Sequence, residues 1–358
     1  MQKKQRNLPQ PGLKARATGW ATGWATACGL AATLALASQG AAAQARNVQA
    51  ELDALIKAAK AEGEVTFYIG LTENVATRIA GAFTAKYGIK AQFIRLDAVA
   101  LIGRYSAEAE AGNIAADVFS SAGGADAFAE EALKKGWIEP LTQAGIPMLN
   151  SGEFPAALNR GRSAIMSVSP WMLVYNTDKV KGADLPKDWT DLLNPKWKGQ
   201  VVVNNPAVSG AFIDFWSVIQ DRYGDQFLTK LKDNIRPVGT PLQGTQGVGA
   251  GEASFMLPVV QGQVQGAKDK GAPLNTILMS YTTGVVTHVM LTTKAKAKHY
   301  NAGRLFINYV LSPEGNKVVN DDPGGFTIYD TSRLPKEYTS PKPGSAGRKD
   351  AIVKMLGF

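Results

Sequence analysis

One local pattern occurs three times in a row between residues 63 and 136, and it constrains the fold more than any other feature of the sequence. Each copy is a strand-like apolar run, a turn of small and polar residues, and a segment with apolar residues at helical spacing. The strand-like runs are 63–69, 89–96 and 117–119, and the helix-like segments are 75–87, 98–111 and 125–135. Strands that alternate with helices in this way form parallel sheets, so the pattern predicts an α/β fold.

Two of these turns are candidates for ligand binding, because ligands of open α/β sheets bind beyond the carboxyl ends of the strands. The turn at 70–74 contains Thr72, and the turn at 120–124 contains Ser120 and Ser121. Both turns carry hydroxyl groups and small residues rather than bulky side chains. This composition suits the recognition of a small polar ligand by hydroxyls and backbone N–H groups.

The pattern returns in the second half of the chain, where the apolar run 201–203 is followed by a polar turn and by helical spacing that continues through 214–234. We expect Ser209, Gly210 and Ala211 in the first turn of that helix, whose N–H groups have no partner within the helix. Small residues let an anion approach these donors, and the helix dipole favours it. The alternative is that Ser209 only caps the helix.

The first 45 residues have the features of an export signal. A basic head without acidic residues precedes an Ala/Leu-rich run that is most apolar at 29–37, and small residues follow at 38–45. This is the order of a secretory signal peptide, and we expect cleavage after Ala43 or Ala45. The apolar run is too short and too interrupted to anchor the chain in a bilayer. We therefore expect a periplasmic protein.

Removal of this segment changes both the charge and the cysteine content. The full chain has a formal net charge of +9, and residues 1–45 contain five basic residues and no acidic one, so the remainder carries +9 − 5 = +4. This weak charge, without a block of Lys and Arg, argues against a nucleic-acid partner. The single cysteine, Cys28, lies in the predicted signal, which excludes disulfides in the exported form. The alternative is that Cys28 is a lipid-modified first residue.

The sequence offers little for catalysis. The patterns HExxH, GxSxG and GxxxxGK[ST] are absent, and the two histidines, His288 and His299, lack metal-ligand spacing. The glycine-rich run 247–251 has no lysine and no clear strand before it, so we interpret it as a flexible turn rather than a phosphate loop. We expect a non-enzymatic protein that holds no cofactor and no metal.

Several segments, taken in order, resemble a known family. They are the signal, the first strand with its Gly-Leu-Thr-Glu turn, the run Asp-Val-Phe at 117–119, and the segments 174–179, 189–199 and 301–314. In this order and spacing they resemble the periplasmic solute-binding proteins of ABC importers, in the branch that includes the ferric-ion-binding proteins. The resemblance extends over nearly the whole chain after residue 45.

The resemblance implies the type II periplasmic binding fold, an α/β architecture with two lobes, a hinge of crossing strands and a ligand cleft between the lobes. The implied lobes are 46–166 plus 287–335 and 167–286 plus 336–358, with crossings near 167–171 and 283–288. It also implies a partner, an inner-membrane ABC permease that recognises the closed lobes. A sensor kinase is the alternative partner, and we expect the binding protein itself to be a monomer.

Ferric-binding relatives hold iron through a histidine, a glutamate and two adjacent tyrosines, with an anion completing the ligand shell. By position these four residues fall at Thr72, at Ala122 and near Ser254 and Phe255, so none of the four is present. Ferric ion is a hard cation that needs anionic oxygen ligands. The resemblance therefore does not carry the iron site over to this chain.

The anion-binding helix start of that branch, Ser-Gly-Ala, is matched here by residues 209–211. We therefore expect the ligand to be a small organic anion, a carboxylate or a phosphonate, with its charged head at Ser209, Gly210 and Ala211. For hydrogen bonds and an apolar wall, the further candidates are Thr72, Ser120 and Ser121, and Trp171, Phe255 or Tyr281. The carboxylate of Glu73, together with Tyr281, keeps iron or an iron chelate open as the alternative ligand.

Overall fold

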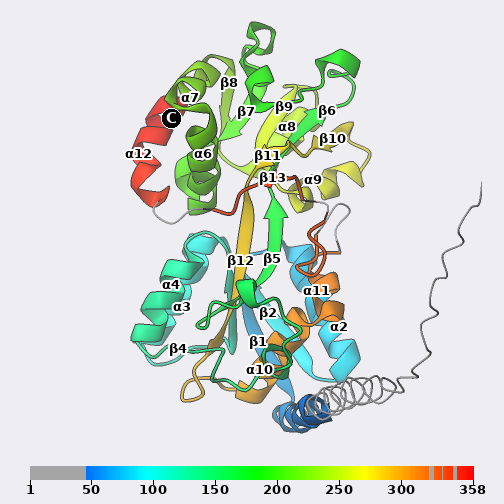
Figure 1. Ribbon diagram of the computed structural model, residues 1–358, viewed down its shortest axis with the longest axis vertical. Coiled ribbons are helices and arrows are strands. Elements are labelled where there is room, and N and C mark those ends of the chain that lie inside the picture. Colours follow the sequence, from blue (N-terminus) through cyan, green and yellow to red (C-terminus); the bar gives the residue numbers. More distant parts are fainter. Residues whose placement is uncertain (1–45, 322–325, 333, 342–344) are drawn as a thin grey trace, which may run out of the picture. The chain divides into compact units, whose positions relative to one another are not determined.

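The computed structural model describes residues 46–321, 326–332, 334–341 and 345–358. The predicted export signal at 1–45, and with it Cys28, lies outside the described residues. The part of the chain from Val48 to Phe358 is one unit. It is built on two mixed β-sheets with helices packed on their faces (Figure 1).

The first sheet has the strand order β2-β1-β3-β12-β4, and β5 also pairs with β12. Its strands are β1 (Glu64–Ile69), β2 (Lys90–Arg95), β3 (Val118–Ser121), β4 (Ile138–Glu139), β5 (Ala164–Pro170) and β12 (Gly284–Thr292). The predicted parallel arrangement of the first three strands is confirmed, because β1 pairs in parallel with β2 and β3. The sheet is mixed because β12 runs antiparallel to β3, β4 and β5.

Helices cover both faces of this sheet. They are residues 46–62, α2 (Glu73–Tyr87), α3 (Ala98–Glu110), α4 (Ala125–Lys134), α5 (Pro147–Asn150), α10 (Tyr300–Leu311) and α11 (Pro313–Val319). The alternation of side chains along β1 separates two cores. Phe67 stacks on Phe306 of α10 with ring centroids 4.4 Å apart, whereas Tyr68 belongs to the other core with Tyr105 and Phe119. We call this half of the unit the first lobe.

The second sheet has the order β10-β6-β9-β7-β8 and forms the centre of the second lobe. Its strands are β6 (Met172–Asn176), β7 (Val201–Asn204), β8 (Ile235–Val238), β9 (Phe255–Val259) and β10 (Leu274–Ile277). Its helices are α6 (Gly210–Tyr223), α7 (Asp225–Leu231), α8 (Pro241–Gly249), α9 (Gln261–Lys268) and α12 (Lys349–Leu356). Because β7 is parallel to β8 and β9, the carboxyl ends of these three strands lie at one edge of the sheet.

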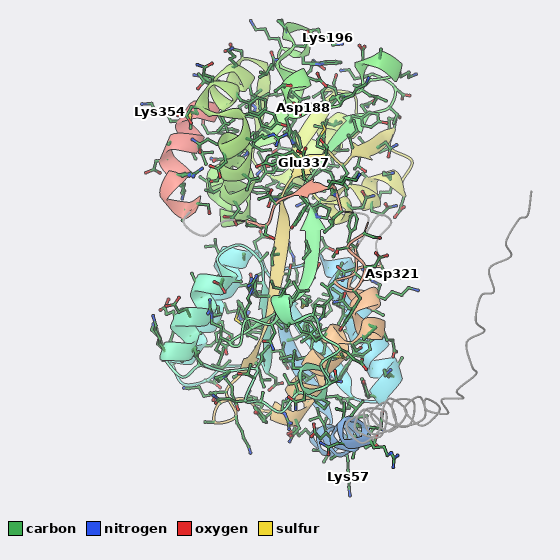
Figure 2. The ribbon with its side chains drawn as sticks, in the orientation of Figure 1. Lys57, Asp188, Lys196, Asp321, Glu337 and Lys354 are labelled. Carbon is green, nitrogen blue, oxygen red and sulfur yellow. The ribbon has the colours of Figure 1, made fainter. Side chains whose placement is uncertain are left out.

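Two neighbouring connections join the sheets. β5 ends at Pro170 and β6 begins at Met172, and β12 begins at Gly284, which pairs with Pro170. A further pair, β11 (Tyr281–Thr282) with β13 (Glu337–Tyr338), lies beside this crossing (Figure 1). Exposed lysines such as Lys57, Lys196 and Lys354 lie far from it, on the outer surfaces of the two lobes (Figure 2).

Two local predictions are wrong. The helix expected over 214–234 is divided at Gly224, whose φ of 75° breaks it into α6 and α7. The glycine-rich run expected to be a flexible turn falls largely in α8, which Thr240 caps by accepting a hydrogen bond from the N–H of Gln243. A Cβ on Gly244 would overlap Met256 Sδ and lie 3.0 Å from Val202 Cγ1, so this glycine lets α8 pack closely on β7 and β9. The tail contains α12.

Candidate functional site

Ser209, Gly210 and Ala211 lie at the start of α6, as predicted. Ser209 is the N-cap residue, and its Oγ accepts a hydrogen bond from the N–H of Ala211 at 3.3 Å. Gly210 is exposed, and within the described part of the chain its N–H has no acceptor. The side chain of Ser209 therefore caps the helix, and a backbone donor at the positive end of the helix dipole remains available to an anion.

The turn after β3 lies directly against this helix start. A Cβ placed on Gly123 would be 2.9 Å from the backbone nitrogen of Ala211 and 3.3 Å from Ser209 Oγ. A Cβ on Gly210 would be 3.9 Å from the nitrogen of Gly124. The structure thus brings together two turns that are far apart in sequence, one from each lobe, and only glycine at position 123 fits between them.

The two serines of the β3 turn differ in their partners. Ser120 Oγ donates to Met166 Sδ at 3.4 Å, whereas Ser121 is fully buried and its Oγ has no partner among the described residues. A Cβ on Gly70 would lie 3.3 Å from Ser121 Oγ, and the N–H of Gly70 donates to the carbonyl of Ser120 at 2.9 Å. The turn after β1 is therefore the neighbour of the turn after β3, as parallel pairing requires.

Thr72 is the N-cap residue of α2, but its hydroxyl makes no capping hydrogen bond. Thr72 Oγ1 is buried and has no partner among the described residues. Glu73 is exposed in the first turn of α2, where the helix dipole stabilises its negative charge. Of these two candidates, Thr72 lines a cavity between the lobes and Glu73 does not.

This cavity has a volume of about 70 Å³ and lies beside the crossing strand β5. Its described lining is Leu71, Thr72, Val75, Ser167, Ser169, Pro170, Met172, Val260, Gln261, Gly262, Val319, Asn320 and Phe326. These residues come from both lobes and from the crossing itself. The lining combines an apolar wall with hydroxyl and amide groups.

Apart from Thr72, the polar residues of this cavity were not predicted from the sequence. Ser167 Oγ donates to Asn320 Oδ1 at 2.8 Å, and Gln261 is held by Thr276 and Gln265 at 3.1 and 3.2 Å. Two signals were available. Ser167 and Ser169 alternate along a strand that was expected to cross between the lobes, and Gln261 follows the carboxyl end of β9, where ligands of such sheets bind.

The three aromatic candidates do not line the cavity. Trp171 is 2% exposed and packs on Phe212 with ring centroids 5.4 Å apart. Phe255 is fully buried against Trp197 at 4.8 Å. Tyr281 donates its hydroxyl to the carbonyl of Val218 at 3.2 Å.

The position of Phe255 follows from the strand register. β9 is parallel to β7, and Phe255 pairs with Val201, the first residue of β7. Phe255 therefore lies at the amino end of its strand, away from the edge where α6 begins. The residues of this segment that reach the cavity are Val260, Gln261 and Gly262, five or more positions further along the chain.

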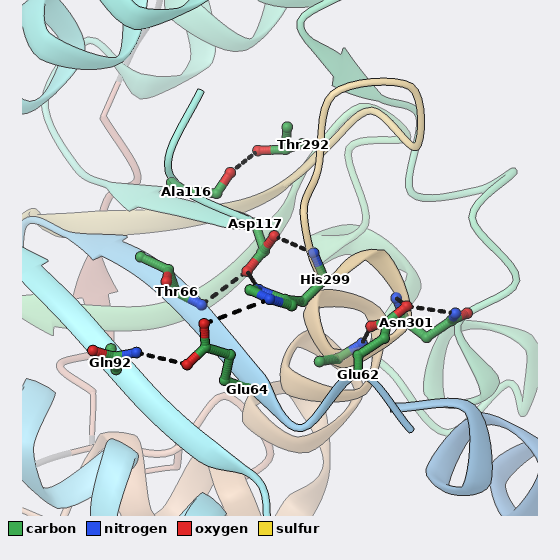
Figure 3. Close-up of polar contacts among 10 residues, drawn as sticks. Glu62, Glu64, Thr66, Gln92, Ala116, Asp117, Thr292, His299 and Asn301 are labelled. Carbon is green, nitrogen blue, oxygen red and sulfur yellow. Dashed lines mark hydrogen bonds and ion pairs between the residues drawn. The ribbon is translucent and has the colours of Figure 1, made fainter. Parts of the chain in front are cut away.

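Both histidines are bound to neighbouring side chains. Nδ1 of His299 lies 3.1 Å from Asp117 Oδ2, and its Nε2 lies 3.5 Å from Glu64 (Figure 3). Nδ1 of His288 lies 3.0 Å from Ser163 Oγ, and burial lowers the pKa of His288 to about 4. Over the described residues, no group of three or more His, Cys, Asp or Glu side chains is arranged to hold a metal ion.

Comparisons with known proteins agree with this architecture. Residues 113–340 match the bacterial extracellular solute-binding proteins. The major ferric iron-binding protein of Neisseria meningitidis serogroup B is 25% identical over 281 residues, which cover 74% of this chain and 81% of that protein. Iron-bound HitA from Pseudomonas aeruginosa gives a TM-score of 0.64 at 21% identity, over 82% of this chain and 99% of HitA. AfuA from Actinobacillus pleuropneumoniae, with fructose-6-phosphate bound, gives 0.59 at 19% identity, over 82% of this chain and 96% of AfuA.

These similarities confirm the predicted class of fold, the two-lobed α/β architecture of type II periplasmic binding proteins. The family match extends over more than half of the chain, so the chain belongs to the bacterial extracellular solute-binding proteins. It is a solute-binding protein and not an enzyme. None of the helices in the described segments has the length and apolar character that a membrane span requires.

Proposed function

We propose that the protein is the substrate-binding component of an ABC importer and captures a small organic anion, a carboxylate or a phosphonate, in the periplasm. The observation that carries this proposal is the start of α6, where Gly210 is exposed and its N–H has no acceptor among the described residues. This helix start faces the turn after β3 in the first lobe, where Gly123 lies beside Ala211. A ligand bound there touches both lobes, which couples binding to closure.

The chemistry of this region favours an anionic head group. Backbone N–H groups at a helix start point outward, and the dipole of a helix of 14 residues adds partial positive charge. Ser121, in the turn that faces α6, supplies a buried hydroxyl that has no partner in the described segments. The relative AfuA, which was solved with fructose-6-phosphate, supports an organic anion as a ligand for this architecture.

Delivery to a permease follows from the two-lobed design. We propose that the first lobe comprises residues 46–166 plus 287–335 and the second lobe 167–286 plus 336–358. Closure about the crossing strands then gives the liganded protein a surface that the open form lacks. The signal-like segment at 1–45 supports export to the periplasm.

Ferric iron, alone or as a chelate, is the second candidate, because the curated relative from N. meningitidis is named for ferric iron binding. The four positions matched to iron ligands hold Thr72, Ala122, Ser254 and Phe255, none of which offers an anionic oxygen. The nearby carboxylate, Glu73, is exposed outside the described cavity lining. These features make the organic anion the better supported ligand.

A melting screen tests the proposal. The exported form, from Arg46 onward, is heated with small carboxylates, alkylphosphonates, inorganic phosphate and ferric citrate. A ligand at a hundred times its dissociation constant stabilises the native state by about 2.7 kcal/mol, which shifts the melting temperature measurably. We expect a carboxylate or phosphonate to shift the melt and ferric citrate to leave it unchanged.

The variant Ser209→Asp locates the head group. Aspartate caps helices as well as serine, so the fold is retained while a negative charge is placed at the anion site. The matched control is Asn194→Asp, because Asn194 is exposed and caps a 3-10 helix by accepting a hydrogen bond from the N–H of Lys196, two residues further on, as Ser209 does from Ala211. We expect the ligand-induced shift to disappear in Ser209→Asp and to persist in Asn194→Asp. Persistence in both variants, or a coloured ferric complex, contradicts the proposal.

A further inference from the structure

Thr72 is an N-cap residue that does not cap. Threonine at this position normally accepts a hydrogen bond from an N–H group of the first helical turn. Here its hydroxyl makes no such bond, and Oγ1 is buried without a partner in the described part of the chain. A buried polar group without a partner is rare and costs stability, so it calls for a partner that arrives from outside.

The surroundings of Thr72 show what such a partner is. The cavity that Thr72 lines has an apolar wall to which Leu71, Val75, Met172, Val260, Val319 and Phe326 contribute. Its hydroxyl and amide groups come from Thr72, Ser167, Ser169, Gln261 and Asn320, and the described lining includes no charged side chain. Apolar walls bind hydrocarbon, and neutral hydrogen-bonding groups bind hydroxyl or amide groups.

Most of these polar groups are already engaged. Ser167 is bound to Asn320, Asn320 donates to the carbonyl of Asn316 at 2.9 Å, and Gln261 is held by Thr276. They form a fixed frame, whereas Thr72 Oγ1 is buried and has no partner among the residues that the structure describes. A ligand group that enters the cavity gains most from a hydrogen bond to Thr72, because that bond also removes the cost of an unsatisfied hydroxyl.

We infer that this cavity is the specificity pocket for the uncharged end of the ligand. The pocket takes a short aliphatic segment of about two or three carbons that ends in a hydroxyl or amide group bonded to Thr72, as its volume of about 70 Å³ permits. The substrate class is a monoanion with a neutral polar tail, as distinct from a dicarboxylate or a metal chelate. This inference rests on the proposed function, because the charged head is placed at α6.

Neighbouring turns of the first lobe link the start of α6 to Thr72. Gly70 lies two positions before Thr72, and a Cβ on it would be 3.3 Å from Ser121 Oγ. Ser121 belongs to the turn whose Gly123 faces Ala211. The turns after β1 and β3 are therefore neighbours at one edge of the first sheet. The turn after β3 contacts the start of α6, and the turn after β1 contains Thr72, which lines the cavity.

The test is a calorimetric titration of the purified protein with two matched series. One series is methyl-, ethyl-, propyl- and 3-hydroxypropylphosphonate, and the other is propanoate, butanoate and 4-hydroxybutanoate. For wild type we expect each added methylene to tighten binding about three- to fivefold until the pocket is filled. We expect the terminal hydroxyl to tighten it further.

The variant Thr72→Val removes the hydroxyl and keeps the shape, and it costs no capping bond. We expect it to weaken the hydroxyl-bearing probes about tenfold and the plain alkyl probes less than twofold. The matched control is Thr77→Val, since Thr77 is exposed on the same helix and lies outside the cavity lining. It should change neither.

The outcomes separate this inference from the function on which it rests. If the probes bind wild type with an affinity that ignores chain length, or if Thr72→Val weakens all probes equally, the pocket is wrong and the anion site stands. If a dicarboxylate binds and the monoanions do not, the pocket fails and the anion site stands, whereas binding of ferric citrate alone means that the anion proposal and the pocket both fail. A dependence on chain length together with a loss confined to the hydroxyl-bearing probes supports both.

Discussion

The starts of α2 and α6 are the same kind of structure used in two different ways. Each helix follows the carboxyl end of a parallel strand, and each has a hydroxyl residue at its N-cap. The hydroxyl oxygen of Ser209 accepts a hydrogen bond from the N–H of Ala211. Thr72 leaves its hydroxyl buried and without a partner in the described chain. The two helix starts face the region between the lobes from opposite sides.

The difference separates two modes of recognition. At α6 the side chain completes the cap, so a ligand is offered backbone N–H groups and the helix dipole, which recognise charge. At α2 the ligand is offered a side-chain hydroxyl beside an apolar wall, which recognises a neutral polar group. A binding site with one helix start of each kind selects a ligand with two unlike ends.

The largest expected effect is a loss of folding stability at acid pH. It arises in the first lobe, which contains the start of α2 and not the start of α6. His288 lies on β12 and pairs with Ser121, and burial lowers its pKa from 6.5 to about 4. Between these values the unfolded chain binds more protons than the native one, so stability falls as pH falls. We expect a loss of about 3 kcal/mol between pH 6.5 and pH 4 in urea unfolding.

The control for this effect is His288→Gln, which is neutral over the whole range. The slope of its unfolding free energy against pH should be smaller than that of wild type in that window, by the amount that corresponds to about one bound proton. Equal pH dependence in wild type and His288→Gln contradicts the assignment to His288.

The next effect concerns the contact between the turn after β3 and the start of α6. Gly123→Ala places a Cβ 2.9 Å from the backbone nitrogen of Ala211, which cannot move aside as a side-chain end can. We expect the arrangement in which Gly123 meets Ala211 to be less stable by about 2 kcal/mol. Calorimetry should then show about thirtyfold weaker binding of the anion identified in the melting screen. Gly103→Ala is the matched control, because a Cβ on Gly103 in α3 meets nothing within 4 Å. Equal affinities in the two variants exclude this contact from closure.

A smaller effect is expected from the loss of the cap at α6. Ser209→Ala removes the acceptor of the Ala211 N–H, which should lower the free energy of unfolding by about 1 kcal/mol. Urea denaturation of the unliganded protein measures it. An unchanged midpoint and slope would show that the cap contributes nothing.

The smallest effect is expected at α2, where the same measurement should give a contrasting result. Thr72→Val removes a hydroxyl that makes no capping bond, so the free energy of unfolding should stay within about 0.5 kcal/mol of wild type or rise. A loss as large as that of Ser209→Ala means that Thr72 has a structural partner in the unliganded protein, and the comparison then fails.

Local structure was largely predictable from the sequence, because its causes lie within a few residues. An alternating run predicted β1, a short strand-like run predicted β3, and the small residues after the apolar run 201–203 predicted the start of α6 near Gly210. The helix end at Gly88, with a φ of 69°, follows from glycine's tolerance of the left-handed region. The prediction of a flexible turn for the glycine-rich run 247–251 was wrong, because most of that run lies in α8.

By itself, the sequence determined the strand–turn–helix units, the serine at the start of α6 and the poor supply of metal ligands, since each follows from residue type and spacing. The tertiary structure alone decided that β12 enters the sheet of β1 to β3, that Gly123 meets Ala211, and that Thr72 shares a cavity with Gln261. These contacts join residues that are far apart along the chain. Whether a hydroxyl caps its helix or stays free also depends on the packing around it, which no local pattern records.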